Sequence, residues 1–119
     1  MLKINNFALE KHFHWLVTAV MIKRIVKLHF REDAVQTFFE SVFEPSKTQI
    51  RAFPGCHSME LLRHAAQPNI LFTLSVWEDA DALEQYRQSE LFQNTWAKTK
   101  ALFQERAEAW SVEVLDGQG

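Results

Sequence analysis

The order in which the apolar periodicity changes along the chain restricts its fold more than any other sequence feature. Residues 21–30 (MIKRIVKLHF) alternate between apolar and polar side chains, as a strand with one exposed face does. From Val35 to Phe43 the apolar residues recur three and four positions apart, the spacing of a helix with one face against a core. Strand patterns return over 56–64 and 70–77, helical patterns follow Asp79 and Ser89, and a last strand pattern covers 110–115.

This βαββαβ order is typical of the ferredoxin-like α+β fold, in which a four-stranded antiparallel sheet carries helices on one face. Pro45 lacks the N–H that a helix interior needs, so we expect the first helix to break or kink near Glu44. A short second turn should then carry Ile50 and Phe53 inward before Pro54–Gly55 ends it.

The strands are too apolar for a sheet that packs helices on one face and meets water on the other. Over 70–77 one parity is wholly apolar, and the other, which should face the helices, carries Thr73, Ser75 and Trp77. Strand 110–115 is similarly short of polar residues. Since helices cover only one face of such a sheet, the sequence predicts a homodimer closed sheet to sheet.

Composition excludes several classes of protein. The chain has 119 residues, 47% of them hydrophobic, which is enough for one core without metal or disulfide support. A net charge of -2 argues against nucleic acid or an anionic membrane surface as the main partner. No apolar run reaches the roughly 18 residues of a spanning helix. The single cysteine, Cys56, excludes an internal disulfide and fits a cytoplasmic location.

The chain divides into an N-terminal extension at residues 1–20, a domain at 21–116 and a frayed tail at 117–119. Three interpretations of the extension stay open. It loosely imitates a signal peptide, although Glu10, His12 and His14 crowd its apolar stretch and no cleavage site follows. It is otherwise an upstream extension before a natural start at Met21, or a short amphipathic helix that docks on the domain.

Four stretches of the domain resemble the antibiotic biosynthesis monooxygenase family, whose members are dimeric α+β barrels. They are the opening strand Ile22–Phe30, the turn Arg51–Cys56 (RAFPGC), the strand end Val76–Asp79 (VWED) and the helix entry Ser89–Phe92 (SELF). The family includes oxygenases, isomerases, heme degraders and members without a known reaction, so the resemblance fixes the fold more firmly than the activity.

The resemblance implies a pocket between the sheet and its own helices. Quinone-forming members use neither metal nor flavin, and they hold a phenol or dihydroxyarene in a dry cavity where it reacts with dioxygen itself. Trp77 falls where those members place a tryptophan beside the substrate. Thr73 falls where some of them place an asparagine, whose amide a hydroxyl does not copy.

The resemblance also bears on heme. Tyr86 falls where heme degraders have a buried tryptophan, and Trp96 falls where they have the iron-binding histidine. Val26 or Lys27 occupies the position of their asparagine. Because an indole does not ligate iron, heme degradation is not expected.

Other residues offer chemistry on their own. His57 would be a general base near neutral pH, although a lone histidine at a strand start is usually a surface residue. Ser75 needs a hydrogen-bond partner, either the backbone or a ligand. The aromatic residues Trp77, Tyr86 and Trp96 are either plain core or pocket walls. No spacing indicates a metal site.

Three hypotheses follow. In the first, the protein is a cofactor-independent monooxygenase that oxidises a small aromatic substrate, with Trp77, Thr73 and His57 as catalytic candidates. Ser75, Tyr86 and Trp96 would then contact the substrate. The second is a ligand-binding or isomerising member without oxygen chemistry. The third is a heme-binding protein, for which His57 and His29 are the only candidate ligands in the domain.

Overall fold

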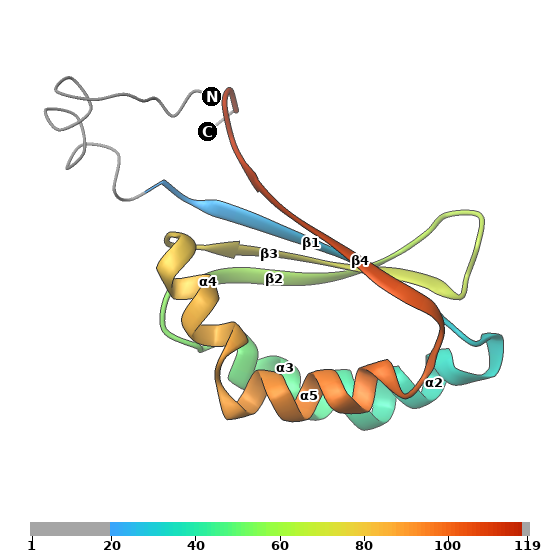
Figure 1. The fold of residues 1–119 in the computed structure, drawn as a ribbon. Helices are drawn as coiled ribbons and strands as arrows, with labels where there is room; N and C mark the ends of the chain where they lie inside the picture. Colours follow the sequence, from blue (N-terminus) through green and yellow to red (C-terminus); the bar gives the residue numbers. More distant parts are fainter. Residues whose placement is uncertain (1–19, 118–119) are drawn as a thin grey trace, which may run out of the picture.

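The computed structural model describes residues 20–117 as one sheet covered by helices on one face (Figure 1). In chain order the elements are β1 (Ile22–Phe30), the 3-10 turn η1 (Glu32–Ala34), α2 (Val35–Phe38), the π-helical turn η2 (Phe39–Phe43), α3 (Glu44–Arg51), β2 (Cys56–Arg63), β3 (Ile70–Trp77), α4 (Ala80–Arg87), α5 (Glu90–Lys100) and β4 (Phe103–Glu113). The strand order is β2-β3-β1-β4, and all neighbours are antiparallel. The predicted ferredoxin-like α+β fold is confirmed.

Residues 1–19 and 118–119 lie outside the described residues, and with them most of the predicted extension and tail. No helix within residues 20–117 is long and apolar enough to cross a membrane.

The alternation of β1 places one parity in the core, as predicted. Ile22, Leu28 and Phe30 are buried, and Phe30 is completely inaccessible to solvent. Leu28 and Phe30 pack against the buried Phe38 and Val42 of the first helical segment. Burying such side chains supplies roughly 1.5–3 kcal/mol each, which fixes the register of the central strand.

Pro45 does not break the first helical segment, so the break that we expected near Glu44 does not occur. The helix changes type instead: the Glu44 N–H donates to the Phe39 carbonyl within a π-helical turn, and α3 then continues to Arg51. Pro45 is the second residue of α3 and directly follows this wider turn, which accommodates a residue without an N–H. Ile50 is buried, as expected.

The last strand is longer than predicted, because it begins at Phe103 rather than Trp110. Phe103 lies opposite Phe30 of β1, with the two ring centroids 5.4 Å apart. Pairing along nearly the whole of β1 overrides the helical spacing that the local sequence shows.

The sheet face away from the helices keeps an apolar surface. Leu62, Trp110, Val112 and Val114 are each more than a third exposed, and they come from the two edge strands and the segment after β4. This agrees with the apolar second face that the strand patterns indicated.

Candidate active site

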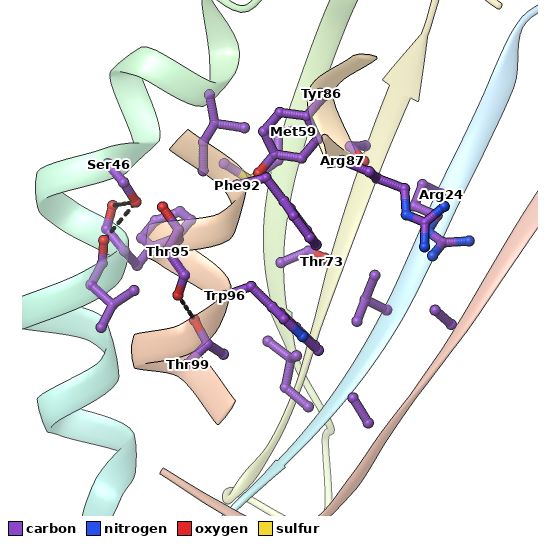
Figure 2. A pocket seen from close by; sticks show the side chains of 18 of the residues that line it. Arg24, Ser46, Met59, Thr73, Tyr86, Arg87, Phe92, Thr95, Trp96 and Thr99 are labelled. Carbon is purple, nitrogen blue, oxygen red and sulfur yellow. Dashed lines mark hydrogen bonds between the residues drawn. The ribbon is translucent and has the colours of Figure 1, made fainter. Parts of the chain in front are cut away.

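A cavity of about 290 Å³ lies between the inner face of the sheet and the helices (Figure 2). All four strands and the helical segments contribute to its wall. Most of the lining is apolar or aromatic, which is typical of small-molecule sites. The lining residues are Arg24, Val26, Leu28, Phe38, Val42, Phe43, Ser46, Ile50, Met59, Thr73, Ser75, Trp77, Leu83, Tyr86, Arg87, Phe92, Thr95, Trp96, Thr99, Ala107 and Ala109.

Five of the six site residues predicted from the sequence line this cavity: Thr73, Ser75, Trp77, Tyr86 and Trp96. The first three come from alternate positions of β3, whose inward parity they share. Tyr86 comes from α4 and Trp96 from α5. Strand alternation and helical spacing therefore bring these side chains together from three elements.

Trp77 lines the cavity and is held by two interactions. Its side chain is 1% exposed, and its indole Nε1–H donates to Ser75 Oγ over 2.9 Å. Its ring stacks on that of Tyr86, with centroids 4.9 Å apart and planes 26° from parallel. The orientation of the indole is thus fixed before any ligand enters.

The turn before β2 helps to position Trp77 at the end of β3. Gly55 has a φ of +88°, and its carbonyl accepts a hydrogen bond from Glu78 N–H, immediately after Trp77. Asp79 then caps α4 by accepting from the Ala82 N–H over 2.8 Å. The proline-glycine turn and the helix cap, both visible in the sequence, therefore set where β3 ends and α4 begins.

Ser89 begins the second helix of the site. Its hydroxyl accepts from the Phe92 N–H over 3.1 Å and donates to the Tyr86 carbonyl over 2.6 Å. Phe92 stacks on Trp96, with centroids 5.9 Å apart, and meets Tyr86 edge to face at 5.3 Å. A continuous aromatic wall thus runs from β3 across both helices.

Only some of the hydroxyl groups that line the cavity are free to donate a hydrogen bond to a ligand. Ser46, Thr95 and Thr99 donate to carbonyls of their own helices, so their protons are engaged (Figure 2). The buried Ser75 hydroxyl accepts from Trp77, and no other group in residues 20–117 accepts its proton. Ser75 is thereby free to donate into the cavity.

Tyr86 is a second donor. Burial raises the pKa of its hydroxyl to about 12, with a smaller contribution from nearby Cys56. The group therefore stays protonated at neutral pH, and it serves as a hydrogen-bond donor rather than a base.

The structure places His57 outside the cavity. A β-bulge between Cys56 and Ser58 interrupts the alternation of β2, so His57 does not share the inward parity of Met59. The His57 side chain is 46% exposed, and its Nε2 lies 2.7 Å from Glu78 Oε1. His57 therefore does not line the cavity, and the sequence analysis did not anticipate this because alternation alone does not reveal a bulge.

Two cavity residues were missed in the sequence. Arg24 lies on the inward parity of β1, between Ile22 and Val26, and Arg87 follows Leu83 by one helical turn. In both cases the signal was a charged residue on an otherwise apolar face. Both guanidinium groups lie at the same end of the cavity (Figure 2).

The cavity lining contains only three ionisable side chains, Arg24, Tyr86 and Arg87. It includes no histidine or carboxylate within residues 20–117. In the same part of the chain, no group of three or more histidine, cysteine, aspartate or glutamate side chains could hold a metal ion. His29, the other candidate heme ligand, does not line the cavity.

A ferredoxin-like α+β domain with an aromatic cavity under its sheet defines the class of protein. The model of the antibiotic biosynthesis monooxygenase family matches residues 21–98, so the chain belongs to this family. Among curated proteins, none matches the sequence significantly.

Solved structures agree with the fold. Rv0793 from Mycobacterium tuberculosis is 22% identical, with a TM-score of 0.75, and the match covers 83% of this chain and 99% of that one. A conserved protein from Methanosarcina mazei Go1 is 18% identical, with a TM-score of 0.75 and coverage of 82% and 96%. SnoaB, a cofactor-independent oxygenase from Streptomyces nogalater, is 21% identical, with a TM-score of 0.71 and coverage of 83% and 97%.

Proposed function

We propose that the protein is a cofactor-independent monooxygenase that oxidises a small aromatic substrate, a phenol or a hydroquinone, with dioxygen in this cavity. The observation that carries the proposal is an aromatic-walled cavity with hydroxyl groups free to donate, on Thr73, Ser75 and Tyr86. Family membership and the likeness of fold to SnoaB, a cofactor-independent oxygenase, support it.

The substrate supplies all the electrons in this reaction. A phenolate passes one electron to dioxygen, and the two radicals combine to form a C–O bond at a ring carbon. The O–O bond then breaks: one oxygen stays as a quinone carbonyl, and the other leaves as water with the hydrogens of that carbon and of the phenol. A phenol and dioxygen thus give a quinone and water, without an external reductant.

The side chains have distinct roles in this scheme. Trp77 walls the aromatic ring, and Tyr86 and Trp96 close the cavity around it. Ser75, oriented by the indole of Trp77, donates to the phenolate oxygen, and Thr73 offers a second hydroxyl two positions earlier on β3. The apolar lining excludes water, which would otherwise compete for these hydrogen bonds.

The decisive experiment is dissolved-oxygen consumption by metal-stripped protein against hydroquinones and polycyclic phenols, corrected for autoxidation. We expect protein-dependent uptake with a quinone product. Uptake no faster than autoxidation across the whole panel would contradict the proposal.

Variants assign the chemistry to the cavity. Trp77→Phe removes the indole N–H that orients Ser75, and we expect turnover to fall about tenfold, or about 1.4 kcal/mol. His57→Ala, outside the cavity lining, is the control and should leave turnover unchanged. Equal losses in the two variants would refute the assignment.

The lining also favours one alternative, because it contains no histidine or carboxylate to act as a general base. A ligand-binding or isomerising protein without oxygen chemistry fits this observation. The same oxygen measurement separates the two functions, since the alternative predicts saturable ligand binding with no uptake.

The apolar outer face supports a homodimer closed sheet to sheet. Trp110 and Val112 of β4 and Leu62 of β2 would be covered by a second copy. Trp110→Glu should give a monomer in sedimentation at micromolar concentration, whereas Gln85→Glu adds the same charge on α4 and should not. A monomeric unmodified protein would contradict the dimer.

The single cysteine supports a cytoplasmic location.

A further inference from the structure

Two guanidinium groups meet at one end of a cavity that is otherwise apolar and hydroxylic (Figure 2). Arg24 is half-buried on the central strand β1, and Arg87 is the last residue of α4. Burial lowers the pKa of Arg24, and the positive charge of Arg87 lowers it further. Like charges held together at one end of an apolar site carry a cost that a bound anion would offset.

The chain itself leaves most of the binding capacity of this pair unused. Arg24 Nη1 donates to Ser111 Oγ over 2.9 Å, and Arg87 Nη1 donates to Glu84 Oε1 over 3.0 Å. Each guanidinium has five N–H donors, and within residues 20–117 each makes only this one side-chain hydrogen bond.

The carboxylate of Glu84 does not neutralise the pair. It also accepts from Gln88 over 2.7 Å, and with Arg24 and Arg87 it leaves one net positive charge at the cavity end. The whole chain carries a net charge of -2, so this positive site stands out against an acidic protein. Such a local charge selects for an anion.

We infer that the ligand of the cavity is an aromatic acid, whose ring lies against Trp77, Tyr86 and Trp96 and whose carboxylate binds Arg24 and Arg87. The forked geometry of a guanidinium matches a planar carboxylate with two parallel hydrogen bonds. A cavity of about 290 Å³ suits one or two fused rings with one such group. The inference names the substrate class of the proposed oxygenase and in that respect rests on it.

Equilibrium binding under anaerobic conditions tests the inference independently of turnover. The probes are 6-hydroxy-2-naphthoic acid and its primary amide, which match in size and differ in charge. Trp77 and Trp96 line the cavity, so quenching of tryptophan fluorescence reports binding. We expect the acid to bind at least about tenfold more tightly than the amide at low salt, and the difference to shrink as salt is added.

Variants locate the charge that is responsible. Arg24→Gln and Arg87→Gln should each weaken binding of the acid about tenfold or more and leave binding of the amide within about twofold. Arg63→Gln, an exposed arginine outside the cavity lining, is the matched control and should change neither. Circular dichroism checks the fold, and Arg24→Met replaces Arg24→Gln if that variant does not fold.

Equal affinities for acid and amide in the unmodified protein would overturn the inference, as would a preference for the acid that survives both substitutions. Selective binding of the acid without oxygen uptake would instead refute the oxygenase and leave the aromatic-acid site standing. Oxygen uptake with neutral phenols but not with aromatic acids would overturn the aromatic-acid site and leave the oxygenase standing.

Discussion

Gly55 is the position where the structure allows the sharpest test of how the site is built. Its φ of +88° lies in the left-handed region, which costs a residue with a side chain about 1–2 kcal/mol. A Cβ added there would lie 2.4 Å from the Cβ of Ala82 in α4, so one of the two must move. Overpacking of this kind costs about 1–3 kcal/mol. Gly55→Ala should therefore destabilise the protein by about 2–5 kcal/mol.

The clash has a single partner, which permits a double-mutant cycle. Ala82→Gly removes the Cβ at 2.4 Å, and the next neighbours of the new side chain lie at 3.7 and 3.8 Å, ordinary contact distances. Alone, Ala82→Gly should cost about 1 kcal/mol as a glycine in a helix. In the double variant only the left-handed strain and this helical cost remain, so the two changes should couple by about 1–3 kcal/mol.

Urea unfolding, followed by circular dichroism, measures all four proteins, and the slope with denaturant checks that the unfolded states are comparable. The expected result is a double variant no less stable than Gly55→Ala alone. Strictly additive losses would refute the reasoning, because they would mean that α4 does not press against the turn that positions Trp77.

Three further predictions concern the site. Tyr86 is the only tyrosine of the chain, so tyrosinate absorbance should titrate near pH 12. Because folding raises the pKa of this hydroxyl, its contribution to the free energy of unfolding is full below about pH 10, and about 2–3 kcal/mol of it is lost towards pH 12. Tyr86→Phe should not show this loss. Ser89→Ala should cost about 1 kcal/mol in urea unfolding and Ser89→Gly only a few tenths, since glycine tolerates the cap position; equal losses would contradict a capping role. The pH profile of kcat/KM should follow the hydroxyl pKa of whichever phenol is used, and a profile identical for phenols of different acidity would point to a protein base instead.

Most of the fold could be predicted from the sequence, because strand alternation and helical spacing are strong and each reports a buried face. The same logic found five cavity residues, since Thr73, Ser75 and Trp77 share a strand parity and Tyr86 and Trp96 share helical faces with other apolar residues. These signals depend only on neighbouring residues in the chain, and in the structure the same residues face the cavity.

The errors arose where distant contacts decide local structure. The π-helical turn before Pro45 shifts the proline into a first turn, and pairing with β1 extends β4 back to Phe103. The bulge that turns His57 outward depends on the register of β2 against β3. None of these has a periodic signature. Arg24 is a different case, because its signal was present in the sequence. A charged residue on an otherwise apolar strand parity interrupts the alternation, and here that residue lines the cavity.

The composition of the cavity bears on the chemistry that it supports. Its free donors are two guanidinium groups, a tyrosine held protonated by burial, and the hydroxyls of Thr73 and Ser75, the second of which also accepts from Trp77. Donors and positive charge favour the anionic form of a bound hydroxyl or carboxyl group and lower its pKa. For the proposed phenol substrate, stabilising the phenolate in this way is enough to populate it without a base from the protein. In the proposed reaction this electron-rich anion is the species that reacts with dioxygen, so the proposal favours substrates whose hydroxyl ionises readily.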